Sequence, residues 1–287
     1  MIGVTGATGQ LGRLVIENLL KKTAASNIVA LVRDAAKANE LKALGVDVRQ
    51  ADYEQPETLT AAFAGIEKLL LISSNAVGSR VPQHLAVIQA AKEAGVQLFV
   101  YTSVLKAGTN PMMLAAEHKP TEAAIQESGI PAVILRNGWY TENYTQNIPA
   151  ILQTGVVAGA AKDGKFHTAA RNDYAEAAAV VLTSEASHAG NVYELAGDAG
   201  FTLAEFAAEV AAQSGKEIAF QDMSGEDFAN LLVQVGLPEG FAAALADSEV
   251  HAANGWLEET GGTLSTLIGR SAQSLSAAVT AALNASQ

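Results

Sequence analysis

The chain has 287 residues, of which 49% are hydrophobic and 17% charged, enough apolar material for one large domain or a domain with a smaller partner. The formal net charge of −12 disfavours nucleic acid as a partner, because a generally acidic surface repels phosphates. The absence of cysteine excludes disulfides, thiolate nucleophiles and sulfur-ligated metals, and five scattered histidines give no support to a zinc site.

The chain opens directly on a strand-like segment, residues 1–4, which leaves no room for a signal peptide. No apolar run reaches the roughly 18 residues that a membrane-spanning helix needs. We therefore expect a cytoplasmic protein without membrane insertion.

Strand-like and helical segments alternate up to residue 135. The expected strands are short runs rich in Val, Ile and Leu, at residues 2–5, 28–32, 46–50, 69–72, 98–102 and 132–135. The expected helices between them are residues 11–22, 36–44, 56–63 and 82–94, and one within 114–127 that breaks near Pro120. Because the strands are continuous apolar runs, they predict a parallel sheet buried on both faces. The fold class expected is α/β, a Rossmann-type doubly wound sheet.

The rhythm becomes irregular after Gly138. Residues 139–173 are rich in Gly, Asn and Tyr, and a helix at 174–182 precedes a strand at 192–195 that could return to the main sheet. An isolated strand is expected at 218–220, and most of the remainder reads as helix, including residues 201–213, 228–235 and 275–283. We expect residues 1–138, with 174–197 returning, to form a dinucleotide-binding domain. Residues 139–173 and 198–287 would form a smaller, mostly helical part that covers the substrate.

A glycine-rich loop follows the first expected strand and opens the first helix. Gly6 permits a tight turn, Gly9 lets the backbone approach a pyrophosphate, and Gly12 lets the helix pack close to the sheet. The alternative to a phosphate-binding role is a glycine turn required only for packing. The context predicts dinucleotide binding by the whole loop, namely Gly6, Ala7, Thr8, Gly9, Gln10 and Leu11.

The residue at the end of the second strand favours NADPH over NADH. An acidic residue there would bind the adenosine ribose, whereas this chain has Arg33, whose guanidinium can bind a 2′-phosphate in a bidentate way. Asp34 follows and could reach the ribose, although capping the next helix is its more ordinary role. Arg33 itself could also be a solvated surface charge.

Ligands of such sheets bind outside the carboxyl ends of the strands, which predicts further contacts by position. Ser73, Ser74 and Asn75 follow the fourth strand and could touch the ribose or the nicotinamide. Other polar or aromatic residues at strand ends are Asp52, Tyr53, Tyr101, Thr102, Ser103 and Arg136.

No Tyr in the chain is followed by Lys four residues later, the pair with which many nicotinamide enzymes of this architecture protonate a carbonyl. Ketone reduction needs such a proton donor for the developing alkoxide. A quinone or an extended cation is already electrophilic, so orientation against the nicotinamide supplies most of the catalysis. The missing pair therefore favours acceptors of the second kind.

Three stretches resemble the NmrA-like branch of the atypical short-chain dehydrogenases: residues 4–12 with Arg33, residues 50–53 and residues 135–144, extended by 192–198. The resemblance spans nearly the whole chain, and residues 136–144 are its most specific part. It implies reduction of a quinone by NADPH, without flavin or metal. Two alternatives stay open: an NADPH-sensing regulatory protein without catalysis, and a reductase of triphenylmethane-type dyes. The oligomeric state is also open.

The resemblance also implies roles for residues. The loop after the sixth strand would hold the cofactor through Asn137, Gly138, Trp139, Tyr140, Thr141 and Glu142, with Arg171 as a lower-ranked candidate. Tyr140, Asn143 and Tyr144 would face the substrate, and Asn143 is the catalytic candidate beside His118. His118 could donate a proton or form only a helix contact. Lys119 is given no catalytic role, because Pro120 occupies the position of the lysine found in some relatives. Trp139, Tyr140 and Tyr144 could form an aromatic wall for a flat substrate or simply pack at the domain junction.

Overall fold

The structure is a computed structural model that describes residues 1–76 and 78–285. The chain forms two compact units. Unit 1 comprises residues 1–107, 117–137 and 171–194, and unit 2 comprises residues 108–116, 138–170 and 195–287.

A seven-stranded sheet forms the centre of unit 1, in the order β3-β2-β1-β4-β5-β6-β8. Its strands are β1 (Ile2–Val4), β2 (Ile28–Val32), β3 (Asp47–Gln50), β4 (Lys68–Leu71), β5 (Leu98–Val104), β6 (Ala132–Asn137) and β8 (Val192–Leu195). The ladders from β3 across to β6 are all parallel, which confirms the predicted parallel sheet, and β8 joins it as the sequence allowed. The order reverses between β1 and β4, the switch point at which such sheets bind ligands.

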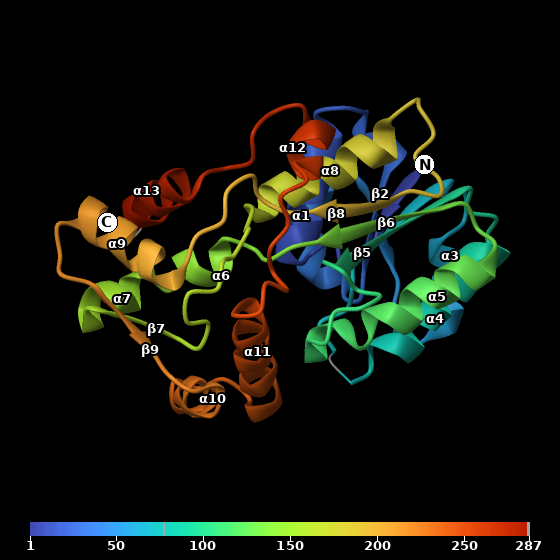
Figure 1. Cartoon of the computed structure of the whole chain (residues 1–287). Coiled ribbons are helices and arrows are strands. Elements are labelled where there is room, and N and C mark those ends of the chain that lie inside the picture. Colours follow the sequence, from blue (N-terminus) through green and yellow to red (C-terminus); the bar gives the residue numbers. More distant parts are fainter. Residues whose placement is uncertain (77, 286–287) are drawn as a thin grey trace. The chain divides into compact units, whose positions relative to one another are not determined.

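Helices cover both faces of the sheet (Figure 1). On one face α1 (Gln10–Leu20) packs against α8 (Arg171–Thr183), and Asn18 Nδ2 donates to Asn172 Oδ1 at 2.9 Å. On the other lie α3 (Pro56–Ala62), α4 (Arg80–Glu93) and α5 (His118–Ser128), each packed on the next. Leu59, Phe63, Val87 and Phe99 belong to the buried apolar cluster of this layer. Strands with helices on both faces of the sheet must carry apolar side chains on both faces. This is why each of them appears in the sequence as a continuous apolar run.

Two helix expectations need correction. Residues 36–44 form a 3₁₀ turn, Ala35–Ala38, followed by α2 (Asn39–Ala43), and Ala25–Asn27 and Met113–Ala115 are further 3₁₀ turns. The expected break at Pro120 is wrong, because α5 runs unbroken from His118. Pro120 is the third residue of that helix, and the missing N–H costs nothing where N–H groups have no intrahelical acceptor.

Unit 2 is mostly helical. Its helices are α6 (Glu142–Thr145), α7 (Ile148–Thr154), α9 (Leu203–Ser214), α10 (Gly225–Gln234), α11 (Glu239–Ala252), α12 (Thr263–Ile268) and α13 (Leu275–Ala285). Strand β9 (Ala219–Asp222) pairs in parallel with β7 (Val156–Gly159). The strand expected at 218–220 is therefore not isolated. The partner strand β7 was not predicted, because β7 has only four residues and begins directly after Gly155.

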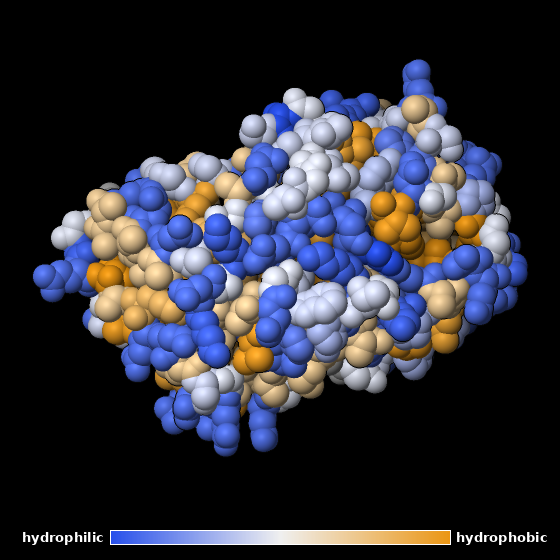
Figure 2. All heavy atoms as spheres, in the orientation of Figure 1, coloured by the Kyte–Doolittle hydropathy of each residue, from blue (hydrophilic) through white to orange (hydrophobic). Residues whose placement is uncertain are grey.

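Hydrophilic side chains are interspersed with apolar ones over the face of the molecule drawn in Figure 2. None of the helices among the described residues combines the length and the apolarity required to traverse a bilayer. Within residues 1–76 and 78–285, no three His, Cys, Asp or Glu side chains are grouped as a metal site would require.

Candidate functional site

The glycine loop forms a tight turn between β1 and α1. Gly6 adopts a left-handed conformation with φ of 57°, and the Gly9 N–H donates to the Gly6 carbonyl at 2.9 Å. A Cβ on Gly12 would lie 2.3 Å from the Gly6 oxygen and 2.8 Å from the Ala7 Cα, so this position has no room for a side chain. Gly9 precedes α1 and supplies no side-chain cap, which leaves the first N–H groups of the helix available to an anion.

Arg33 follows β2 and is exposed to solvent. The next residue, Asp34, accepts a hydrogen bond from the Ala36 N–H at 2.9 Å, which confirms the predicted capping role of its carboxylate. Asp34 is thus engaged with its own chain, which leaves Arg33 as the candidate for a phosphate contact here.

Asp52 and Tyr53 follow β3. The Asp52 carboxylate accepts the Glu54 N–H at 3.1 Å, and its backbone N–H donates to the Thr58 hydroxyl, so Asp52 organises the turn into α3. Burial raises the pKa of Tyr53 to about 12, and a hydrogen bond with Thr5 at the end of β1 opposes that shift.

Strand β5 continues to Val104, so Tyr101 lies within the strand and not at its end as expected. Its hydroxyl lies 2.7 Å from His118 Nδ1, and Arg80 Nη1 lies 3.4 Å from His118 Nε2. Burial, followed by the charge of Arg80, lowers the pKa of His118 to about 3. His118 is therefore a buried, neutral imidazole joined to β5, an arrangement that favours a structural contact over proton donation.

An ion-pair network lies on β6 and its neighbours. Arg136 contacts the Glu122 carboxylate at 2.7 Å and the Glu194 carboxylate at 2.8 Å, and its hydrogen bond to Glu122 raises the pKa of the guanidinium although burial opposes this. Ser103 donates to Glu122, and the Lys106 N–H donates to Glu194. Arg136 thus joins β6 to α5 and β8, and its charge is committed to these two carboxylates.

Asn137 ends β6 and is 5% exposed. Its Oδ1 is buried and has no hydrogen-bond partner among the described residues. An unsatisfied buried acceptor costs about 1–3 kcal/mol, so a ligand that donates a hydrogen bond to this oxygen would recover that free energy. Asn137, the glycine loop, Arg33, Ser73, Ser74, Asn75 and Arg171, the first residue of α8, are the candidate residues that belong to unit 1.

The remaining candidates, residues 138–144, belong to unit 2. The segment is held by backbone bonds: Gly138 donates to Leu195 at 2.7 Å, and Trp139 and Thr141 exchange hydrogen bonds with Ala169. The side chains of Trp139, Tyr140, Glu142 and Asn143 are half-buried. The ring of Tyr144 packs against Phe166, Phe201 and Phe206, with centroids 5.1–6.0 Å apart, so this aromatic residue belongs to the packed core of unit 2.

Glu249, on α11, carries a buried carboxyl that the sequence patterns did not predict. It is 6% exposed, and its Oε2 accepts the Ala160 N–H at 2.6 Å. Burial raises its pKa to about 7. Burial also raises the pKa of Tyr144, and the Glu249 charge adds to that shift. No sequence signal distinguishes Glu249 from an exposed acid, because the helix around it is rich in alanine on every face.

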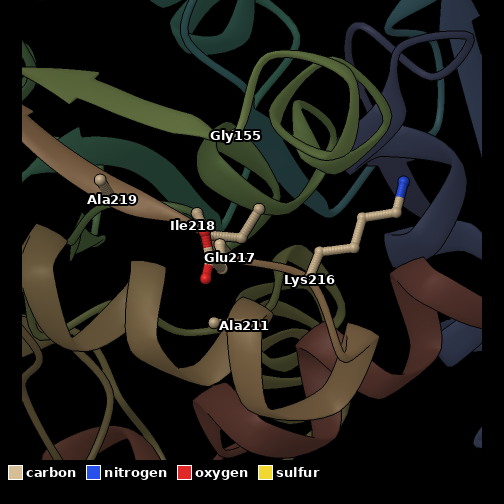
Figure 3. A pocket seen from close by; sticks show the side chains of 6 residues that line it. All are labelled: Gly155, Ala211, Lys216, Glu217, Ile218 and Ala219. Atoms are coloured by element: carbon tan, nitrogen blue, oxygen red, sulfur yellow. The ribbon is translucent and has the colours of Figure 1, made fainter.

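Two surface hollows in unit 2 lie apart from these candidates. One of about 520 Å³ is lined by residues 216–219 with Gly155 and Ala211, and Figure 3 shows Lys216 and Glu217 extending from it in different directions. The Lys216 amine donates to the Leu152 carbonyl at 3.0 Å. The other, of about 750 Å³, lies between α9 and residues 271–275. None of the predicted site residues lines either hollow, so we give them no part in the site.

The model of the NmrA-like family matches residues 1–278. The chain is 55% identical to Quinone oxidoreductase 2 of Escherichia coli (strain K12) over 284 residues, 99% of each chain. The crystal structure of the NADPH-dependent quinone oxidoreductase of that species in complex with NADPH superposes with a TM-score of 0.96, covering 99% of this chain and 100% of that one. The Citrobacter sp. triphenylmethane reductase complexed with NADP(H) is 40% identical, with a TM-score of 0.94 over 98% and 100% of the two chains.

Proposed function

The chain belongs to the NmrA-like family, as its sequence predicted, and we propose that it transfers hydride from NADPH to a quinone. The observation that carries this proposal is the 55% identity, over 99% of both chains, to a quinone oxidoreductase. A cytoplasmic location belongs to the same proposal. The reaction requires neither flavin nor metal, because the nicotinamide supplies the hydride.

Unit 1 has the groups that NADPH requires. The glycine turn and the N-terminus of α1 would bind the pyrophosphate through backbone N–H groups. Arg33 would bind the 2′-phosphate, while the Asp34 carboxylate caps the turn that follows by accepting the Ala36 N–H. The unpartnered Oδ1 of Asn137 fits a donor such as an amide or a ribose hydroxyl. Ser73, Ser74, Asn75, Arg171 and residues 138–142 complete the proposed set.

The chain's contribution to the chemistry would be the orientation of the quinone against the nicotinamide. Tyr140, Asn143 and Tyr144 are the residues that we propose to line the substrate side, with Tyr144 fixed by its aromatic neighbours. The Asn143 amide can donate a hydrogen bond to a quinone oxygen, on which negative charge develops. That oxyanion is delocalised over the ring, so water can supply its proton. We therefore assign no proton transfer to His118, whose neutral ring contacts Tyr101.

The direct test is the oxidation of NADPH by the purified full chain in the presence of several simple quinones, followed by the absorbance of NADPH. We expect saturable oxidation that depends on both substrates. If NADPH binds but no quinone accelerates its oxidation above the uncatalysed background, the regulatory alternative replaces the enzyme. Decolourisation of a triphenylmethane dye, without activity on quinones, would instead identify a dye reductase.

The cofactor assignment predicts that Arg33→Ala raises the dissociation constant of NADPH roughly 10- to 100-fold, as expected for losing charge-assisted hydrogen bonds to a phosphate. The dissociation constant of NADH should change little, because NADH lacks that phosphate. Titrations with both cofactors measure the difference, and Lys92→Ala, an exposed cation on α4, is the control. Equal losses of affinity for the two cofactors would show that Arg33 does not bind the 2′-phosphate.

A further inference from the structure

The loop after β4, residues 72–76, is held by hydrogen bonds to side chains from three different parts of unit 1. The Ile72 N–H donates to the Thr5 hydroxyl at 3.0 Å, and the Ser73 N–H donates to the Thr102 hydroxyl at 2.9 Å. The Ser74 N–H donates to His84 Nε2 at 3.0 Å. Three successive backbone N–H groups are thus bound by the protein itself, in the loop whose Ser73, Ser74 and Asn75 we propose as cofactor contacts.

Hydrogen bonding fixes the protonation of His84, whose side chain is fully buried. Because Nε2 accepts a hydrogen bond from a backbone N–H, it carries no proton, and the proton lies on Nδ1. Nδ1 then donates to the Thr121 hydroxyl at 3.0 Å, and that hydroxyl donates to the Glu117 carbonyl at 2.8 Å. This chain of bonds has a single direction, from Ser74 through His84 and Thr121 to the start of α5.

The same loop is held at a second point on α4. The Ser74 hydroxyl donates to the Gln83 amide oxygen at 2.6 Å and accepts the Ala76 N–H at 3.1 Å. Both the backbone and the side chain of Ser74 are therefore directed to α4. The Ser74 hydroxyl thus shapes the loop. The backbone carbonyls of Ile72 and Ser73 remain as the groups that can contact a ligand.

We propose that His84 is a positioning residue for NADPH: through the Ser74 N–H it sets the loop after β4 so that the backbone carbonyls of that loop face the cofactor. A trans peptide directs each carbonyl opposite to the following N–H, so the Ile72 and Ser73 oxygens point away from Thr102 and His84. The loop then offers acceptors, which suit groups that donate hydrogen bonds, such as ribose hydroxyls. This inference rests on the proposed function, because it requires that NADPH be the ligand.

The test compares His84→Ala with His84→Gln, since the glutamine amide oxygen can still accept a hydrogen bond. We expect His84→Ala to raise the dissociation constant of NADPH, measured by fluorescence titration, about tenfold, the effect of an unsatisfied backbone donor. His84→Gln should restore binding to within roughly threefold of the parent chain. At saturating NADPH, kcat should hardly change, because His84 touches no reacting atom.

A second pair of variants acts on His84 from the other side. Thr121→Ser keeps the hydroxyl that accepts from Nδ1 and should bind NADPH normally, whereas Thr121→Val removes it and should weaken binding. This pair carries the test if His84→Ala does not fold. His188→Ala is the matched control: His188 is half-buried, lies within 2.7 Å of the Tyr193 hydroxyl, and precedes β8, which two strands separate from β4.

Unchanged NADPH affinity in folded His84→Ala and Thr121→Val would overturn the inference and leave the proposed function intact. Failure of the parent chain to bind NADPH would instead overturn the proposed function. Equal loss of affinity in His84→Ala and His84→Gln, with Thr121→Ser equal to Thr121→Val, would show that His84 acts only in packing and would also overturn the inference.

Discussion

Replacement of Gly12 by alanine is expected to weaken NADPH binding roughly a hundredfold and to lower the stability of unit 1 by about 1–3 kcal/mol. The added Cβ would lie 2.3 Å from the Gly6 oxygen, 2.8 Å from the Ala7 Cα and 2.9 Å from the Gly6 carbonyl carbon. All three atoms belong to the backbone of the turn, so no side chain can rotate to relieve the overlap. Either α1 must move away from the turn or the turn must open, and both changes displace the N–H groups proposed to bind the pyrophosphate.

Titration of NADPH with folded Gly12→Ala, checked by circular dichroism and thermal unfolding, measures this effect. Gly240→Ala is the matched control, because a Cβ on Gly240 would meet nothing within 4 Å. Gly240 also lies in a helix, α11, so the control adds the same methyl group to a helical backbone. Retention of NADPH affinity by Gly12→Ala would show that the close approach of α1 to the turn is dispensable, and the role given to this glycine would be wrong.

The parallel sheet of unit 1 could be predicted because burial on both faces leaves a strong signature. Strands such as Ile28–Val32 are apolar at every position, and the glycine or polar residues after them mark their ends. Strand β7 escaped prediction for the opposite reason. Val156–Gly159 has an alternating burial pattern over only four residues, too short for a periodicity to be recognised.

Of the candidate site, the sequence predicted the parts that depend on local structure. The tight turn at Gly6 and the cap at Asp34 involve residues close in the chain, so their chemistry is readable from the sequence. The bonds of His84 depend on how α4 packs on α5, and 37 residues separate it from Thr121. A helical pattern predicts which face of each helix is buried but not which polar groups of two helices meet.

Lowering the pH is expected to destabilise unit 1, because this unit contains two buried, neutral histidines, His84 and His118. Burial, followed by the charge of Arg80, lowers the pKa of His84 to about 4 and that of His118 to about 3, from an ordinary 6.5. Between these values the unfolded chain binds protons that the folded unit does not. The stabilisation is therefore complete above about pH 6.5 and is lost as the pH falls towards 4. Its full size is on the order of 3 kcal/mol for His84 and on the order of 5 kcal/mol for His118.

Unit 2 should respond in the opposite direction. Burial raises the pKa of Glu249 from 4.5 to about 7, so the folded unit retains a proton that the unfolded chain has lost. That contribution is complete below about pH 4.5 and is lost as the pH rises towards 7. Acidification from about pH 7 to about pH 5 should therefore weaken unit 1 through its histidines, while the Glu249 contribution to unit 2 increases.

Hydrogen exchange read separately on peptides of the two units, at about pH 7 and about pH 5 with exchange rates corrected for pH, measures both responses. The double variant His84→Gln, His118→Gln has no imidazole to charge at these sites, so its unit 1 should lose much less stability on acidification. Glu249→Gln should likewise reduce the pH response of unit 2 and keep an amide oxygen for the Ala160 N–H. An unchanged pH response of unit 1 in the double variant would mean that groups other than these two histidines govern its acid stability.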